Sequence, residues 1–347
     1  MRIPYTSPLP AALSTHTTLS SGLSALSDFL TSSQSLTVLT GAGISVPSGL
    51  SDYRGAQGTY SLNPTYVPIF HSQFLRSHLS RQRYWARSFF GFPLTAQRVP
   101  NAAHEAVGQL RDVAGIVTQN VDSLHVKAHP WLETVELHGY LRETVCGTCG
   151  EEFSRLRFQK MLSELNPAWG DLLERVVREG GLETEDYALR EKKGLRMNPD
   201  GDLDVPGLEY ERFRYPPCPH CVQAGRTVTG SDGEYDPVVS KGKGVLKPAV
   251  VMFGENIPEK RRRKAQELAQ RCDRLLVLGT SLATYSAWRL VKEVRDRNAP
   301  IAIVNLGGVR NEEMLLTDKS VRLDMRVEDV LPKLVGSGRE FMPAPWR

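Results

Sequence analysis

The sequence predicts an α/β fold, in which a doubly wound, parallel, Rossmann-like sheet carries a smaller inserted module. Short apolar runs alternate with helical patterns along the chain, and this alternation is typical of parallel sheets. The apolar runs are continuous rather than alternating, as expected for strands that are buried on both faces. Two long stretches interrupt the alternation, so we expect them to leave the sheet.

Most predicted strands are apolar runs that end in a small or polar residue, and the predicted helices lie between these runs. The strands are expected at 36–40, 115–118, 248–251, 274–279 and 301–305, and the helices at 20–31, 102–112, 258–272 and 284–298. The sheet domain is then discontinuous, because the module interrupts it twice. Its segments are 19–54, 99–145 and 245–336, those of the module are 55–98 and 146–244, and an extension (1–18) and a tail (337–347) flank them.

The amino-acid composition does not indicate a specialised class of protein. The 347 residues are 40% hydrophobic and 24% charged, which is ordinary for a globular protein. A formal net charge of +4 is too small to require a nucleic-acid or membrane partner. Since no run of 18 apolar residues occurs, we expect no membrane span.

Four of the five cysteines form two C-x-x-C pairs, Cys146 with Cys149 and Cys218 with Cys221, separated by 68 residues. Two such pairs supply four thiolates for one tetrahedral zinc ion, and four protein ligands leave no position open for chemistry. We therefore predict a structural zinc in the inserted module. Two redox pairs or an iron–sulfur site are the alternatives. Cys272, at the end of a predicted helix, is expected to be a buried packing thiol.

A glycine-rich turn follows the first predicted strand. Gly41, Gly43 and Gly49 lie there in the spacing G-x-G-x5-G, and the run DYR at 52–54 comes within ten residues. Glycines at the carboxyl end of a strand let the backbone approach a pyrophosphate closely. A tight strand-to-helix turn without a ligand explains the glycines equally well.

Polar residues also follow the strand at 115–118, as the run TQNVD at 118–122. Open α/β sheets bind ligands at this edge, although a loop that caps a helix is the alternative. The run ELHG at 136–139 comes eight residues before the first cysteine pair and contains His138. An imidazole near its unperturbed pKa can take a proton at neutral pH, which makes His138 a candidate base. We expect the remaining histidines near these motifs to be structural: His104, His125 and His129.

Together these motifs resemble those of the sirtuin family, in its class II form with Asp-Tyr-Arg after the glycines. They occur in family order, and the resemblance extends from about residue 20 to 335. It implies an enzyme that uses NAD as a co-substrate, and it implies cofactor contacts at nineteen positions. These are Gly41, Ala42, Gly43, Ile44, Ser45, Asp52, Tyr53, Arg54, Gln119, Asn120, Val121, Asp122, Gly279, Thr280, Ser281, Asn305, Leu306, Gly307 and Val327.

The resemblance also implies roles for single residues. His138 would be the catalytic base, and Asn120, the second catalytic residue, would contact the ribose together with Gln119. Asp122 would hold the nicotinamide carboxamide, and Arg54 would offset phosphate charge.

The run KPAVVMFGE at 247–255 resembles the sirtuin segment that pairs with an extended substrate peptide. An unpaired strand edge offers main-chain donors and acceptors to a peptide of any sequence, whereas an ordinary buried strand is the alternative. The resemblance implies substrate contacts from this segment and places two apolar side chains beside the lysine. The residues are Val251, Phe253, Gly254 and Glu255.

Tyr84 and Arg87 resemble the class II pair that faces the acyl end of the substrate. A buried arginine there could bind a carboxylate bidentately and favour succinyl or glutaryl groups. A solvated basic helix face is the alternative. The surrounding run RQRYWAR resembles the sirtuin-four branch in particular.

The implied function is an NAD-dependent protein-lysine deacylase, which transfers the acyl group to ADP-ribose and releases nicotinamide. Protein ADP-ribosyl transfer or lipoamide removal on the same scaffold is the alternative. An oxidoreductase would usually carry the turn G-x-G-x-x-G, which is not the spacing found here. A non-catalytic NAD sensor would not need His138 beside Asn120 and Asp122.

The first 35 residues are rich in Ser and Thr, with Asp28 as their only acidic and Arg2 as their only basic residue. Low acidity suits a mitochondrial transit peptide, but a single basic residue does not. The family resemblance points to the mitochondrial matrix, with the cytoplasm or nucleus as alternatives. We expect a monomer that acts on acyl-lysine proteins, without nucleic acid or membrane.

Overall fold

Six parallel strands form the central sheet, in the order β11-β10-β9-β1-β2-β3. Because the order runs outward from β1 in both directions, the sheet is doubly wound, as the sequence predicts. Its strands are β1 (Leu36–Thr40), β2 (Val113–Thr118), β3 (Thr134–Glu136), β9 (Arg274–Leu278), β10 (Ile301–Val304) and β11 (Val321–Leu323). The computed structural model describes residues 11–14, 16, 18–55, 58–62, 66–178, 196–197, 202–204, 209–230 and 232–336.

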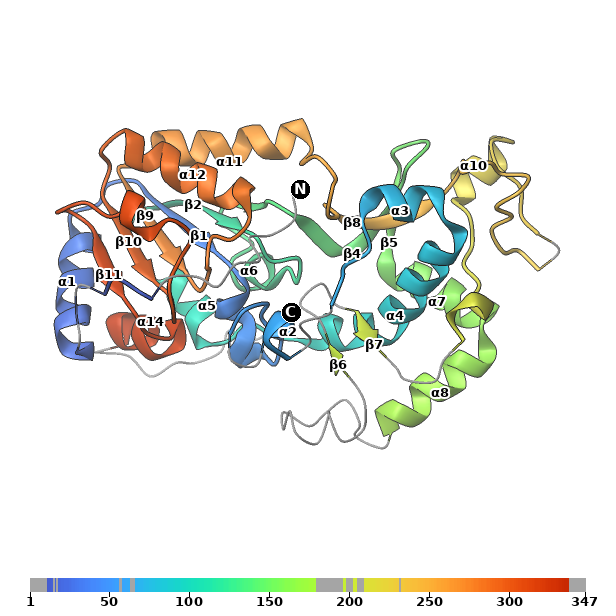
Figure 1. The fold of residues 1–347 in the computed structure, drawn as a ribbon, viewed down its shortest axis with the longest axis horizontal. Coiled ribbons are helices and arrows are strands. Elements are labelled where there is room, and N and C mark those ends of the chain that lie inside the picture. The colour runs from blue at the N-terminus through green and yellow to red at the C-terminus, as the bar shows by residue number, and fades with distance from the viewer. Residues whose placement is uncertain are drawn as a thin grey trace.

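Helices cover both faces of this sheet (Figure 1). One face packs against α1 (Leu19–Thr31), α5 (Ala102–Val107) and α14 (Val327–Val335), and the other against α11 (Glu259–Arg271) and α12 (Tyr285–Asp296). Neighbouring residues of one strand pack into different cores. Val38 packs on the side of α1, α5 and α14, and Leu39 packs on the side of α11 and α12. This two-sided burial explains why the strand sequences are continuously apolar.

The smaller module lies beside one end of the sheet (Figure 1) and has a core of its own, rich in aromatic side chains. Its antiparallel sheet has the order β5-β4-β8. The strands are β4 (Gly139–Cys146), β5 (Glu152–Ser154), β8 (Leu246–Val250) and the short pair β6 (Arg196–Met197) and β7 (Leu203–Asp204). The helices are α3 (His71–Arg76), α4 (His78–Gln97), α7 (Arg155–Leu165), α8 (Pro167–Arg178) and α10 (Pro219–Gln223). The described residues also form short helical turns: η1 (Ala42–Ser48), α2 (Thr59–Leu62), α6 (Leu124–Ala128), η2 (Tyr210–Arg212) and α13 (Glu312–Leu315).

The predicted strand at 248–251 exists as β8, but its expected place in the parallel sheet is wrong. β8 pairs antiparallel with β4, with Leu246 opposite Cys146. All five of its residues are buried, now against the core of the module. A short apolar run does not reveal which sheet buries it, so the sequence could not separate the two cases. The helix predicted at 102–112 is shorter and ends at Val107.

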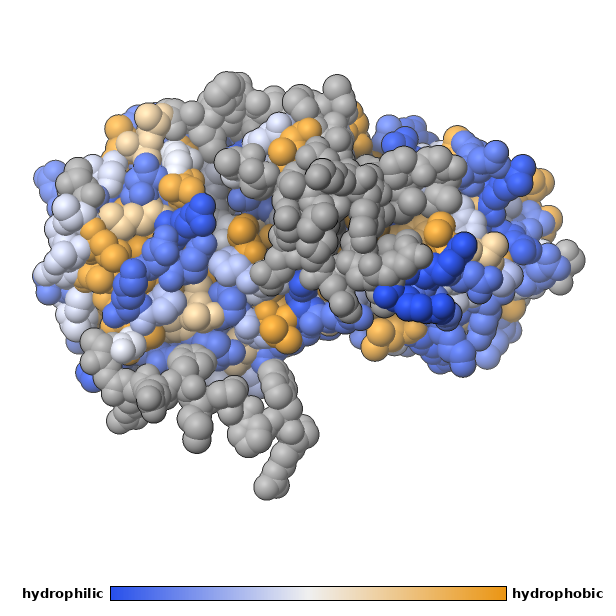
Figure 2. All heavy atoms as spheres, turned by 90° about the horizontal axis from the view of Figure 1, so that it is seen from below, coloured by the Kyte–Doolittle hydropathy of each residue, from blue (hydrophilic) through white to orange (hydrophobic). Residues whose placement is uncertain are grey.

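Parts of the predicted domain plan lie outside the described residues: 1–10 of the extension, most of 179–208 in the module and the tail at 337–347. The domain boundaries stay a prediction. Figure 2 shows one face, on whose described part apolar residues lie in separate groups among hydrophilic ones. In the described ranges no helix combines the length and the apolar character needed to cross a membrane.

Two turns at the carboxyl ends of β1 and β9 touch through their backbones. The amide of Gly43 donates to the carbonyl of Gly279 at 2.9 Å. A Cβ atom at Gly41 would lie 2.5 Å from Cβ of Thr280, and Gly279 itself has a φ of +56°. Side chains at these glycines would force the turns apart. The glycines are therefore required for the packing of the two turns, whether or not a ligand also needs them.

Replacing Gly43 by alanine would place Cβ 2.8 Å from the carbonyl oxygen of Gly279. The backbone of one of the two turns must then move. We therefore expect the free energy of unfolding, measured with urea, to fall by about 1–3 kcal/mol. Gly170→Ala is the matched control, since a Cβ there meets nothing within 4 Å in helix α8. Its stability should stay equal or rise by up to about 1 kcal/mol. Equal stability of the two variants would contradict this account of the turn.

Candidate active site and metal centre

Polar side chains from the turns after β1 and β2 meet where these neighbouring strands end. Asn120 donates from Nδ2 to the carbonyl of Gly41 at 3.0 Å and to Oγ of Ser45 at 3.1 Å. Ser45 donates in turn to the carboxylate of Asp122 at 2.7 Å. Burial raises the pKa of Asp122, while hydrogen bonds from the Leu124 amide and from Ser45 lower it. The structure thus brings three predicted cofactor residues into one network that holds the glycine turn.

Gln119 ties the end of β2 to the turn after β9. Its Nε2 donates to Oγ1 of Thr280 at 2.8 Å and to the carbonyl of Thr40 at 3.2 Å. Its Oε1 accepts from Oγ1 of Thr284 at 3.0 Å. Thr284 is the N-cap residue of α12, but its side chain makes no capping hydrogen bond to the helix.

His138 lies between β3 and β4, and both of its ring nitrogens have a partner. Nδ1 is 3.2 Å from the carbonyl oxygen of Gln119, and Nε2 is 2.9 Å from Oγ of Ser286. Since a carbonyl only accepts, Nδ1 carries the proton of the neutral ring and Nε2 keeps the lone pair.

Burial lowers the pKa of His138 to about 4, against the hydrogen bond to Gln119, and the charge of Arg261 lowers it further. The expectation of an ordinary imidazole pKa was therefore wrong, because sequence alone does not reveal that the ring is only 6% exposed. At pH 7 the ring is neutral and its Nε2 lone pair can accept a proton.

The three histidines expected to be structural pack behind the strand ends. The ring centroids of His104 and His125 are 4.9 Å apart, and those of His125 and His129 are 6.1 Å apart. Nε2 of His125 lies 3.0 Å from Oγ1 of Thr40, in β1. Burial lowers the pKa of all three, so they are uncharged at pH 7 and support the turn as packed rings.

The run at 52–54 is folded back on itself. The Asp52 carboxylate accepts from the Gly55 amide at 2.8 Å, and burial raises the pKa of this aspartate. Tyr53 stacks on Tyr60 with ring centroids 5.7 Å apart, and the Arg54 guanidinium lies 5.1 Å from the same Tyr60 ring. Burial lowers the pKa of Arg54, which remains cationic at pH 7 and so keeps the charge expected to face phosphate.

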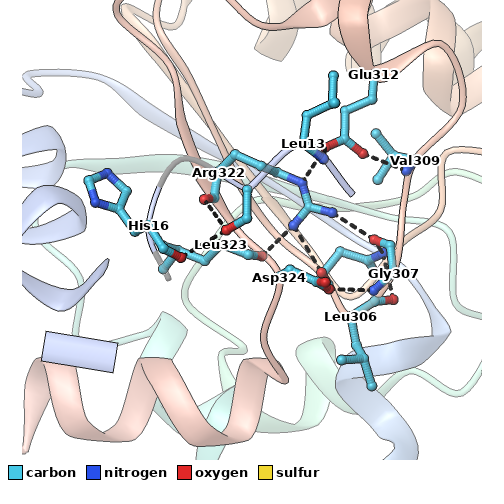
Figure 3. A network of polar contacts seen from close by, with 11 residues as sticks. Leu13, His16, Leu306, Gly307, Val309, Glu312, Arg322, Leu323 and Asp324 are labelled. Atoms are coloured by element: carbon cyan, nitrogen blue, oxygen red, sulfur yellow. Dashed lines mark hydrogen bonds and ion pairs between the residues drawn. The ribbon is translucent and has the colours of Figure 1, made fainter. Parts of the chain in front are cut away.

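A buried ion pair holds the turn after β10 (Figure 3). This turn contains three of the predicted cofactor contacts, Asn305, Leu306 and Gly307. Arg322 on β11 pairs with Glu312 at 2.7 Å, and both side chains are fully buried. The same guanidinium donates to the carbonyls of Asn305 at 2.9 Å and Gly307 at 2.6 Å. Because buried charges need partners, this network fixes the backbone of the turn while Leu306 stays 61% exposed.

Two other predicted cofactor residues differ in exposure. Ser281 is half-buried after β9, whereas Val327, the first residue of α14, is 2% exposed and belongs to the apolar core beside α1. Val121 is half-buried, packs against the core of the module, and accepts from the Leu141 amide at 3.0 Å.

The predicted substrate segment follows β8 and contacts the loop of the candidate base. The amide of Val251 donates to the carbonyl of His138 at 2.7 Å. Phe253 is already bridged to Phe70, because its carbonyl accepts from the His71 amide at 2.8 Å.

Glu255 also has partners within the chain. Its carboxylate lies 3.3 Å from Nζ of Lys247 and accepts from the Met252 amide at 2.9 Å. Gly254 has a φ of +82°, which fits the turn between these residues. Peptide binding by this segment stays a prediction.

Tyr84 and Arg87 are buried in α4, not on a solvated face. The Arg87 guanidinium pairs with the carboxylate of Asp202 at 3.0 Å, with the two side chains 2% and 6% exposed. It also lies 5.8 Å from the ring of Tyr66, which packs edge-on against Tyr60. A series of contacts therefore joins the 52–54 run to Arg87.

Sequence reasoning missed Ser286 and Asp202. Ser286 lies 148 positions after the histidine it contacts, and Asp202 is far from Arg87 along the chain. No local motif marks either residue, since only the folded chain creates these pairs.

The four paired cysteines cluster where β4 ends and α10 begins. Their Sγ atoms all lie within 4.8 Å of one another, with Cys146 3.6 Å from Cys221 and Cys149 3.8 Å from Cys218. Zinc–sulfur bonds of about 2.3 Å in a tetrahedron separate sulfurs by about 3.8 Å, so these thiols fit one zinc ion. The distances are far too long for disulfide bonds.

Comparison with known proteins gives one family. The Sir2 family model matches residues 41–286. The NAD-dependent protein deacylase SIR4 of Batrachochytrium dendrobatidis is 38% identical over 330 residues, which cover 93% of this chain and 96% of the relative. The NAD-dependent protein lipoamidase sirtuin-4, mitochondrial, of Bos taurus is 35% identical over 310 residues, which cover 88% and 84%.

A solved structure described as "Sir2-p53 peptide-NAD+" is similar in fold. Its TM-score is 0.57 at 24% identity, and the match covers 88% of this chain and 94% of that chain. At this identity the similarity concerns the fold alone.

The cysteine cluster predicts about one zinc ion per chain, measurable by elemental analysis. Cys218→Ser should lose the metal and lower the melting temperature, because structural zinc binding contributes directly to folding. Cys272→Ser is the matched control, since Cys272 is equally buried but packs in the sheet domain, away from the cluster. Zinc retained by Cys218→Ser, or lost from Cys272→Ser, would contradict the assignment.

Proposed function

The chain belongs to the Sir2 family, and we infer from this membership and from the site that it is an NAD-dependent protein-lysine deacylase. The observation that carries the inference is the state of His138. This ring is buried and neutral at pH 7, and it carries its proton on Nδ1, which donates to the Gln119 carbonyl. It lies at the edge of the sheet where Asn120 and Asp122 follow the end of β2.

The donors at this edge suit a dinucleotide. Asn120, Asp122 and Gln119 offer amide and carboxylate groups, and the glycine turn offers backbone that no Cβ covers. When bound, NAD supplies the ADP-ribose that accepts the acyl group, with release of nicotinamide.

The protein's own residues then orient the cofactor and take a proton from it. We propose that Asn120 and Gln119 hold the ribose, that Asp122 holds the carboxamide, and that His138 takes a proton from a ribose hydroxyl. A neutral base is ready without a prior change of protonation.

We propose that the acyl pocket includes Tyr84 and Arg87, and that Asp202 sets its charge preference. Arg87 already has a buried carboxylate partner at 3.0 Å. An acyl chain that ends in a carboxylate would therefore meet Asp202 as well as Arg87, and two carboxylates repel each other. A neutral chain avoids this cost. This supports lipoamide removal as the second candidate activity, which is the activity named for the Bos taurus relative.

We propose acyl-lysine proteins as substrates and a monomer as the working form, with no nucleic-acid partner. The mitochondrial matrix is the proposed compartment, because the Bos taurus relative is named mitochondrial. Cytoplasm and nucleus are the alternatives.

His138→Ala should keep the fold and NAD binding but lose turnover by about two to four orders of magnitude, the usual weight of general base catalysis. Nicotinamide release with an acyl-lysine peptide measures this loss. His129→Gln is the control, because His129 is also buried but contacts the His104 carbonyl instead of the strand-end network. Near-normal turnover in His138→Ala would remove His138 as the base. Formation of reduced cofactor instead of nicotinamide would indicate an oxidoreductase.

Asp202→Asn should raise the ratio of catalytic efficiencies for glutaryl-lysine over acetyl-lysine by at least about tenfold. The reason is that Arg87 becomes available for a charge-assisted pair worth roughly 1.5–3 kcal/mol. Arg87→Met should lower the same ratio. Asp232→Asn is the matched control, since it breaks an exposed pair with Arg214 in the same module. An unchanged ratio in both test variants would place Arg87 outside the acyl pocket.

A further inference from the structure

Only one nitrogen of the candidate base can accept a proton. Nδ1 of His138 faces the Gln119 carbonyl oxygen at 3.2 Å and must carry the proton of the neutral ring. The lone pair is therefore on Nε2. That lone pair is directed at the hydroxyl of Ser286, whose Oγ lies 2.9 Å away.

Ser286 is held in place by the helix that carries it. It is the second residue of α12, directly after Tyr285, and it is half-buried. The preceding Thr284 is anchored to Gln119 through its own hydroxyl. The first turn of α12 is thereby fixed against the end of β2, and Ser286 is presented to His138 before any substrate is bound.

An sp² nitrogen has a single lone pair in the plane of the ring, so it accepts one good hydrogen bond at a time. A substrate hydroxyl and the hydroxyl of Ser286 cannot both donate to Nε2. We propose that Ser286 caps the lone pair of His138 in the free protein and has to be displaced before His138 accepts a proton. This rests on the proposed role of His138 as the base.

The cap has an energetic consequence for NAD binding. Placing a ribose hydroxyl on Nε2 breaks the hydrogen bond to Ser286, and this loss reduces the affinity for NAD. Once displaced, the serine hydroxyl can rotate to another staggered position, because its side chain has one heavy-atom torsion. The proton then passes from the substrate oxygen to Nε2, and the electron pair of the O–H bond stays on the oxygen.

A double-mutant cycle tests the cap without relying on turnover. NAD binding is measured by calorimetry for wild type, Ser286→Ala, His138→Ala and the double variant. Ser286→Ala should tighten NAD binding by about two- to tenfold, the weight of one net hydrogen bond. In the His138→Ala background the same change should leave the affinity unaltered, because no lone pair remains to be released. Ser286→Thr retains the hydroxyl and should bind NAD like wild type.

Each other outcome overturns the cap. Unchanged or weaker NAD binding in Ser286→Ala would show that the hydroxyl does not compete with the substrate. An equal gain with and without His138 would show that Ser286 acts through another residue. A tenfold or larger fall in the kcat of Ser286→Ala would make the serine a proton relay instead of a cap. The role of His138 is judged separately, by nicotinamide release from His138→Ala, so failure of one idea does not decide the other.

Discussion

The backbone contact between the turns after β1 and β9 is the constraint on which the rest of the site depends. Gly43 donates to the Gly279 carbonyl, and no Cβ fits between the turns. This contact places Ser45 within reach of Asn120 and Asp122, and Thr280 within reach of Gln119. The polar network at the strand ends therefore follows from two places in the chain where a side chain would not fit.

Burial sets the electrostatics of this site more than charge does. The environment disfavours the ionised form of both Asp122 and His138, so the pKa of the carboxyl rises and that of the imidazole falls. A base of low pKa is a weak one, but it is fully unprotonated at pH 7. The fixed charges lie farther out, on Arg54 and on the Arg87–Asp202 pair. The charge of Arg87 is thus balanced within the protein by Asp202. A buried arginine therefore no longer implies by itself a preference for an acyl group that ends in a carboxylate.

Local patterns were sufficient for the features that depend on neighbours in sequence. The strand at 36–40, the glycine turn and both cysteine pairs could be read directly, because period, spacing and residue type carry these signals. β8 was assigned to the wrong sheet because an apolar run records burial but not its partner strand. The pairs of His138 with Ser286 and of Arg87 with Asp202 were missed for a related reason. Each joins distant segments, and a single serine or aspartate has no periodicity to detect.

β4 and β8 connect the candidate metal centre to the candidate base. β4 begins at Gly139, directly after His138, and ends at Cys146, a predicted zinc ligand. The second cysteine pair is tied to the residues just before β8, because the Cys218 amide donates to the Gly244 carbonyl at 2.8 Å. β8 then leads to Val251, whose amide bonds the carbonyl of His138. A Cβ at Gly139 would lie 2.1 Å from the Ala249 carbonyl oxygen, so these strands meet beside His138 only because residue 139 is glycine. Four thiolates held by one ion would thereby fix the far end of both strands. A metal without an open coordination position would then be connected through these strands to the proposed catalytic histidine.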